Sequence, residues 1–167
     1  MNVTSSRTLP VTAGEGGARV RRVPPPLYYG AAFAAGMLLR SISVPLAIGG
    51  RPATTVLGAA VLAAGAVLSV AGVAQVVRHR TTIVPHRAVS TLVTTGVYRL
   101  SRNPMYTGLA VAYLGSALLA GTWWPLVTLP LALVVVRRAV IDREERYLTD
   151  RFDTAYAEFR TRTRRWL

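Results

Sequence analysis

Two long stretches without a charged side chain constrain the fold of this chain more than any other feature. The first, residues 53–77, is 25 residues long, and the second, residues 105–136, is 32 residues long. A helix of about 20 apolar residues is enough to cross the hydrocarbon core of a bilayer. Hydrophobic residues make up 51% of the chain and charged residues only 16%. The sequence therefore predicts an all-α fold, a polytopic membrane helix bundle.

The second stretch is too long for one membrane helix, because 32 residues would extend about 48 Å at 1.5 Å per residue. Its middle reads GTWWP at 121–125, where Gly suits a helix end, Pro the next first turn, and Trp the membrane interface. Another apolar segment follows Pro24-Pro25-Pro26, and we expect a regular helix there to about residue 40 and a looser continuation beyond it. The expected transmembrane helices are four, at about 27–48, 53–77, 104–121 and 124–141, the last of them continuing past Arg137 and Arg138.

The basic residues are all arginine, and they gather at one end of the predicted bundle. Of the 20, 18 lie in the two tails or in the linker 78–104, and only Arg40 and Arg51 lie at the other end. This bias follows the positive-inside rule, so we expect both termini in the cytoplasm. The net charge of +13 flanks apolar runs, which favours a membrane protein in contact with lipids over a nucleic-acid-binding protein. Arginine without lysine, beside abundant Ala, Val and Gly, indicates a GC-rich genome and a bacterial plasma membrane.

The polar residues divide the chain into a tail and one domain. Residues 1–23 predict a flexible basic tail, and residues 24–167 a single membrane domain. The linker 78–104 and the tail 142–160 lie on the same side of the membrane, so we expect a ligand site to form between them. The chain has no Cys, which excludes thiolate catalysis, and its two His residues have no carboxylate nearby in sequence. We therefore expect no metal site.

The linker ends in polar residues directly before the third predicted membrane helix. Asn103 suits the N-cap of that helix and Pro104 its first position. A helix N-terminus favours anions, and Arg102 adds a bidentate donor for a carboxylate or phosphate. Gly108 belongs to a small-residue face that lets another helix or a ligand approach the backbone. The alternative is that the linker arginines only contact lipid phosphates.

The C-terminal tail predicts an amphipathic helix over residues 141–159. At 100° per residue, Glu144 and Glu145 fall on the apolar face or at its edge. A carboxylate in such a place is costly unless a cation or a hydrogen-bond donor meets it. The partner is either a linker arginine, such as Arg99 or Arg102, or a cationic ligand. We favour a ligand, because two adjacent acids exceed what one ion pair needs.

The two polar segments together resemble a known family. LVTTGVYRLSRNPMYTG at 92–108, followed by REERYLTDRFDTAYAEF at 143–159, resembles the isoprenylcysteine carboxyl methyltransferase and phospholipid methyltransferase superfamily of integral membrane enzymes. The similarity covers about residues 80–160, and the order, the spacing and the intervening hairpin make it specific. The matching positions are Gly96, Tyr98, Arg102, Asn103, Pro104, Tyr106, Gly108, Glu144, Glu145, Leu148, Phe152 and Tyr156.

The resemblance implies S-adenosyl-L-methionine as cofactor and methyl transfer to a small or lipophilic acceptor, through a carboxyl, thiol or amine group. For such a transfer we expect catalytic roles for Glu145 and Arg102. One Glu holds the cofactor's ammonium, the other accepts a proton from a thiol or amine acceptor, and the arginine holds a carboxylate of the cofactor or of the acceptor. On this basis we expect Glu145→Ala to abolish activity and leave the fold intact. The cofactor pocket implied by the resemblance comprises Gly96, Tyr98, Arg102, Asn103, Pro104, Tyr106, Gly108, Glu144 and Glu145.

Two positions depart from the family pattern, and two other functions stay open. Asn103 stands where carboxyl methyltransferases usually have His, and Asp153 stands where the family usually has Gly. A sterol-reductase-like enzyme using NADPH carries a related Arg-His-Pro motif but generally has many more membrane helices. A non-enzymatic protein that binds anionic lipid would explain the arginines but not the two acids. The oligomeric state is not readable from the sequence.

Overall fold

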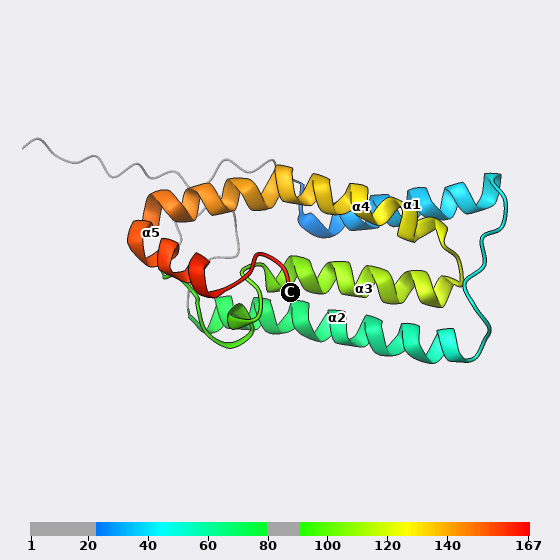
Figure 1. The fold of residues 1–167 in the computed structure, drawn as a ribbon, viewed down its shortest axis with the longest axis horizontal. Helices are drawn as coiled ribbons and strands as arrows, with labels where there is room; N and C mark the ends of the chain where they lie inside the picture. Colours follow the sequence, from blue (N-terminus) through cyan, green and yellow to red (C-terminus); the bar gives the residue numbers. More distant parts are fainter. Residues whose placement is uncertain (1–22, 80–90) are drawn as a thin grey trace, which may run out of the picture.

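The computed structural model describes residues 23–79 and 91–167 (Figure 1). The predicted tail up to residue 22 and the linker segment 80–90, which includes His86, lie outside the described residues. In the described part the chain forms helices and loops, with one isolated β-bridge and no strand. The prediction of an all-α membrane bundle is confirmed.

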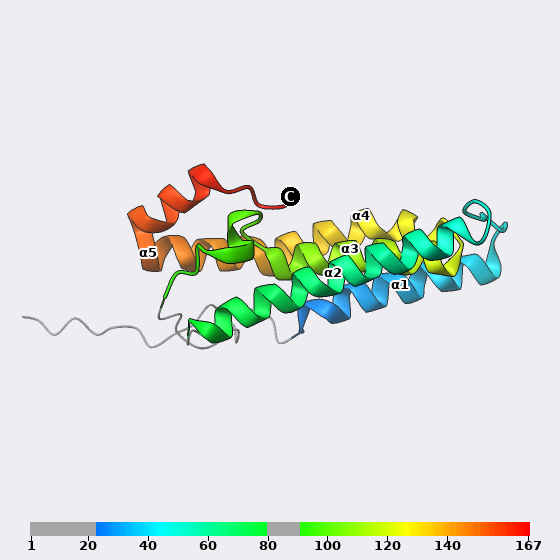
Figure 2. The same ribbon diagram turned by 90° about the horizontal axis from the view of Figure 1, so that it is seen from below.

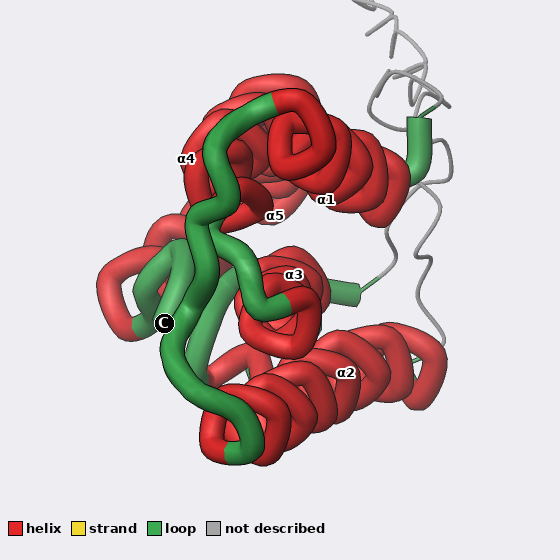
Figure 3. Tube along the Cα trace, turned by 90° about the vertical axis from the view of Figure 1, so that its right-hand side faces the viewer, coloured by secondary structure: helices red, strands yellow, loops and turns green. Residues whose placement is uncertain are grey.

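The helices α1, α2, α3 and α4 run side by side and make up the bundle (Figures 1 and 3). Seen end-on, α1 lies beside α4 and α2 lies beside α3, so the bundle consists of two helix pairs. The helix α2 and the continuous helix that begins at Trp124 are long and apolar enough to cross a membrane, and α3 is a shorter apolar helix. Their bounds are Pro25–Ile42 for α1, Ala53–Arg78 for α2, Pro104–Ala120 for α3 and Trp124–Val136 for α4.

Glycines bring α2 and α3 into backbone contact. Gly58, Gly65 and Gly72 lie seven residues apart along α2, on the face that meets Gly108 and Gly115 of α3. A Cβ atom at Gly65 would lie 2.3 Å from the backbone nitrogen of Ala112. Small residues at a membrane helix interface allow this approach, so the pair is held by close van der Waals packing.

The first helix is shorter than the expected span 27–48. It ends at Ile42, and Ser43 is already extended, two residues before Pro45. The residue before a proline is disfavoured in the helical conformation, which explains the stop. The following segment instead pairs with the α3–α4 turn, where the Trp123 amide donates to the Leu46 carbonyl at 2.9 Å.

The last membrane helix continues well beyond the apolar run, as the sequence predicts. After α4 come a π-helical turn, η2 (Arg137–Ile141), and helix α5 (Asp142–Arg162). The expected uninterrupted helix over 141–159 is wrong, because Asp153 has φ 40° and ψ −111°, which is not helical. Figure 2 shows the chain reversing within α5 and returning toward the bundle, so its second half and the segment 163–167 cover the linker.

Candidate functional site

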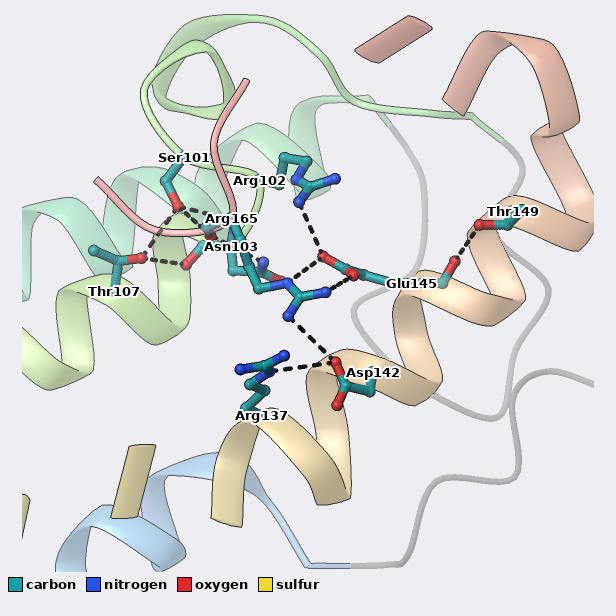
Figure 4. Close-up of polar contacts among 9 residues, drawn as sticks. All are labelled: Ser101, Arg102, Asn103, Thr107, Arg137, Asp142, Glu145, Thr149 and Arg165. Atoms are coloured by element: carbon teal, nitrogen blue, oxygen red, sulfur yellow. Dashed lines mark hydrogen bonds and ion pairs between the residues drawn. The ribbon is translucent and has the colours of Figure 1, made fainter. Parts of the chain in front are cut away.

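The arginine-rich end of the bundle holds a cluster of polar side chains from three parts of the chain. The linker contributes the 3₁₀ turn η1 (Gly96–Arg99) and the residues before α3, helix α5 contributes its first turn, and the segment 163–167 closes over both. Figure 4 shows Glu145 between two arginines, Arg102 from the linker and Arg165 from the closing segment.

Glu145 is buried and ion-paired. Its side chain accepts from Nε of Arg165 at 3.0 Å and from Nη2 at 2.5 Å, a bidentate pair with both carboxylate oxygens. Nη2 of Arg102 lies farther away, 3.5 Å from Oε1. Of the two linker arginines that were possible partners of the acids, Arg102 thus forms the ion pair. Arg99 is exposed. The main partner, Arg165, comes from neither predicted segment.

The side chain of Arg102 is largely buried, and two of its hydrogen-bond donors have no partner among the described residues. Its side chain is only 10% exposed, and Nε and Nη1 have no hydrogen-bond partner among the described residues. Leaving donors of a buried cation unsatisfied is costly, on the order of 1–3 kcal/mol each. A side chain this deeply buried does not suit a role in contacting lipid headgroups. It suits an anionic group of a bound ligand.

Glu144 has a different environment from its neighbour. It is half-buried, and its Oε2 accepts a hydrogen bond from the Tyr106 hydroxyl at 3.0 Å. Burial raises the pKa of Glu144 to about 7, with a smaller increase from Glu145, while the Tyr106 hydrogen bond acts in the opposite direction. No arginine pairs with Glu144 in the described part of the chain. This carboxyl group is therefore the one suited to a cationic ligand.

Two tyrosines form the apolar wall behind these charges. Tyr98 and Tyr156 are buried together with Val76, Val93 and Phe159. Burial, followed by nearby Glu145, raises the pKa of Tyr156 to about 12, and burial with Glu144 raises the pKa of Tyr98. Both side chains stay neutral phenols at physiological pH.

The glycines in the implied pocket have structural roles. Gly96 has φ 61°, and a Cβ there would lie 2.1 Å from Nε2 of Gln75. Only glycine allows the chain to turn this closely over the end of α2. Gly108 packs against Ser69 and Gly65 of α2 and so faces the helix interface instead of the polar cluster.

Asn103 and Pro104 fix the start of α3. Pro104 is the first residue of the helix, as predicted. Asn103 stands at the N-cap position, but its side chain makes no capping bond, which corrects the expected cap. Its Nδ2 instead donates to the Arg165 carbonyl at 3.1 Å, and Thr107 bonds the Asn103 carbonyl. Asn103 therefore ties the closing segment to the linker.

Sequence reasoning did not find the closing segment. Arg165 and the fully buried Ser101, whose hydroxyl donates to the Arg165 carbonyl at 3.1 Å, are central to the cluster. One available signal was Trp166, an aromatic residue next to Arg165 just after the amphipathic helix. Trp166 packs against the core between α1, α3 and α4, which anchors the segment.

The described residues line one hollow beside the cluster and another between two helices of the bundle. One, of about 660 Å³, lies between the linker and the second half of α5, and Arg99, Thr95 and Arg162 are among its lining residues. The other, of about 310 Å³, is mostly apolar and lies between α1 and α3, lined by Tyr29, Phe33 and Leu109 among others. Within the described residues, no group of His, Cys, Asp or Glu could hold a metal ion.

Comparison with known proteins gives one match. A family model described as phospholipid methyltransferase matches residues 53–155, from the start of α2 into α5. The matched range includes Arg102, Tyr106, Glu144 and Glu145, and it ends ten residues before Arg165. Neither a curated protein nor a solved structure matches the chain.

Proposed function

The chain belongs to the phospholipid methyltransferase family, and from this premise we propose that it is an S-adenosyl-L-methionine-dependent membrane methyltransferase. The polar cluster at the arginine-rich end is the proposed cofactor site. The observation that carries this assignment is Arg102, whose guanidinium has two donors without partners among the described residues. It contacts Glu145, and the adjacent Glu144 has no arginine partner in the same part of the chain.

The residues present fit the charged groups of the cofactor. S-Adenosyl-L-methionine carries a carboxylate, an ammonium and a sulfonium. Nε or Nη1 of Arg102 suits the carboxylate, since a charge-assisted hydrogen bond from a guanidinium to a carboxylate is about twice as strong as one between neutral groups. Glu144 suits a cation, and the ring faces of Tyr98 and Tyr106 suit the sulfonium or the adenine. In this proposal Glu144 binds the cofactor's ammonium. Glu145, which was expected to be catalytic, instead forms ion pairs with Arg102 and Arg165.

Methyl transfer from a sulfonium needs positioning and exclusion of water more than it needs acid or base groups. The bound cofactor supplies an already activated methyl group. The protein supplies a rigid floor, because Tyr98, Tyr156 and Ser101 are buried and Glu145 is fixed by two arginines.

The acceptor is proposed to be small or lipophilic and to bear a carboxyl, thiol or amine group. The apolar hollow between α1 and α3 supports a lipophilic one, because it opens at the level of the membrane helices. Tyr29 in its wall donates a hydrogen bond to the Tyr106 carbonyl at 3.2 Å, and the Tyr106 hydroxyl bonds Glu144. Tyr29 and Tyr106 would then lie between an acyl or prenyl chain in this hollow and Glu144.

The test is calorimetric binding of S-adenosylhomocysteine to the purified protein in detergent. We expect binding by the wild type and a loss of roughly tenfold or more in Arg102→Gln, because a charge-assisted hydrogen bond to the cofactor's carboxylate disappears. Arg99→Gln is the matched control, since Arg99 is exposed three residues earlier. Absence of binding by folded wild type would overturn the proposal, and binding of NADPH instead would favour the reductase-like alternative.

A further inference from the structure

The segment 163–167 is built into the polar cluster and does not hang free from α5. The Arg102 amide donates to the Arg164 carbonyl at 2.9 Å, and the Arg165 carbonyl accepts from both Ser101 and Asn103 at 3.1 Å. These backbone contacts place the Arg165 side chain above the first turn of α5. Trp166 packs on the bundle core from the same segment.

In this position Arg165 and Arg102 compete for one carboxylate. Arg165 makes two short hydrogen bonds with Glu145 and a further ion pair with Asp142 at 3.5 Å. Arg102 reaches Glu145 only through Nη2, at 3.5 Å, and keeps Nε and Nη1 without partners in the described residues. A guanidinium next to a vacant carboxylate would form a bidentate pair with it. Arg102 is available to a ligand only because Arg165 already occupies Glu145.

We propose that Arg165 is a positioning residue of the cofactor site, which holds both carboxylate oxygens of Glu145 and thereby leaves Nε and Nη1 of Arg102 unpartnered, so that one of them can donate to the cofactor's carboxylate. This assignment rests on the proposed function, because it presumes that the cofactor binds at Arg102. Without Arg165, the Arg102 guanidinium turns onto Glu145 and its remaining donors no longer point at the ligand.

The experiment compares two ligands on three variants. The ligands are S-adenosylhomocysteine and its amine analogue without the carboxyl group, and the readout is the ratio of their affinities measured by calorimetry in detergent. Arg165→Ala removes the guanidinium group that binds Glu145. Arg165→Lys keeps a cation beside Glu145 but not the bidentate geometry. Arg164→Ala is the matched control, because the Arg164 side chain is exposed and only its backbone carbonyl contacts the linker.

We expect the wild type and Arg164→Ala to prefer the carboxylate ligand by roughly tenfold or more. In Arg165→Ala, the affinity for S-adenosylhomocysteine should fall to about that for the amine analogue, whose own affinity stays unchanged. Thermal unfolding of each variant is recorded in parallel. If Arg165→Ala does not fold, the test relies on Arg165→Lys. Its preference for the carboxylate ligand should then be weaker than that of the wild type but still measurable.

Two results would overturn the role of Arg165. One is an unchanged preference in the Ala variant, or in the Lys variant where that one decides. The other is an equal loss for both ligands, which would mean that Arg165 only stabilises the fold. Wild type that binds neither ligand would overturn the proposed cofactor site itself, so the two failures are distinguishable.

Discussion

Glu144 and Glu145 are adjacent in the sequence but have different partners at the residue scale. Glu145 is held by two guanidinium groups, whereas Glu144 accepts one hydrogen bond from a neutral phenol. Among the described residues, Glu144 has no cationic partner, and burial raises its pKa to about 7. The pair therefore separates into a fixed ion-pair partner and a carboxyl group that titrates near neutral pH.

The pH dependence of ligand binding tests this division. The pKa of Glu144 is raised to about 7, so the group is a carboxylate above pH 7 and neutral below it. Only the carboxylate attracts the ammonium of S-adenosylhomocysteine. We expect its affinity to rise between pH 6 and pH 8, with a limiting slope below pH 7 of about tenfold per unit. Calorimetry across this range measures it.

Glu144→Gln should bind weakly and with little change over the same range, because the amide does not titrate. Asp150→Asn is the control, since Asp150 is exposed on the same helix, and it should keep the wild-type profile. A wild-type profile in Glu144→Gln would assign the titration to another group.

Removal of Glu145 should affect the fold as well as activity. Glu145→Ala leaves the guanidinium groups of Arg102 and Arg165 without their shared carboxylate. Breaking a buried ion pair by removing one partner costs about 3–5 kcal/mol. We expect a clear fall in the thermal unfolding midpoint in detergent, so Glu145→Ala is a poorer test of catalysis than the family resemblance implies.

The control for Glu145→Ala is Glu158→Ala, which removes the exposed pair with Arg162 on the same helix. Exposed pairs contribute little to stability, so the unfolding midpoint should hardly change. Equal midpoints for the two variants would show that the buried ion pairs do not stabilise the protein.

At the scale of the element, the reversal within α5 depends on Asp153. Its φ of 40° lies in the region that glycine favours and other residues adopt at a cost of about 1–3 kcal/mol. Asp153 also stands where the family usually has Gly. We expect Asp153→Gly to raise the unfolding midpoint. Asp150→Gly, in the regular part of the helix, should lower it, because glycine costs about 1 kcal/mol there. A lower midpoint for both would mean that the reversal is not strained.

The contact between α2 and α3 gives a second prediction at this scale. A methyl group at Gly65 would meet the backbone of Ala112 at 2.3 Å, which cannot shift without separating the helices. Gly65→Ala should therefore destabilise the bundle by about 1–3 kcal/mol or more. Gly30→Ala is the matched control, because nothing lies within 4 Å of a Cβ there. Thermal unfolding in detergent compares the two, and equal stability would contradict close packing of α2 on α3.

Most helices could be predicted because their signals are local. Uncharged runs, Pro104 and the GTWWP turn are enough to place α2, α3 and α4, and the small-residue face of α3 indicated a helix contact. The reversal at Asp153 could not be predicted, since 100° periodicity assumes an uninterrupted helix and a positive φ is uncommon for any residue other than glycine. The second half of α5 therefore had no predicted position.

The part of the site that depends on that reversal was missed for the same reason. Arg102 and the two acids follow from motif and periodicity, because each lies at the start of a helix that the sequence predicts. Arg165 reaches Glu145 only after the chain turns back, across a sequence separation of 20 residues. Periodicity along one helix contains no information about that contact.

At the scale of the whole molecule, the two ends of the bundle differ in what they contain. The start of α1, the end of α2, the start of α3 and the segment 163–167 lie at one end of the bundle, and the α1–α2 and α3–α4 connections lie at the other (Figure 1). Of the 14 arginines in the described residues, all but Arg40 and Arg51 lie at the end with the polar cluster. A cofactor site at that end has access to a soluble cofactor only if this end faces the cytoplasm.

The absence of cysteine makes this orientation directly measurable, because a single introduced thiol reports its own side. Gly50→Cys places a thiol in the α1–α2 connection, where a Cβ meets nothing within 4 Å, and Ala157→Cys places one on the exposed surface of α5. By the positive-inside rule, a membrane-impermeant maleimide should label Gly50→Cys in intact cells and Ala157→Cys only after lysis. Labelling in the reverse order would place the polar cluster outside the cell. It would then remove the proposed site from the cytoplasmic supply of S-adenosyl-L-methionine.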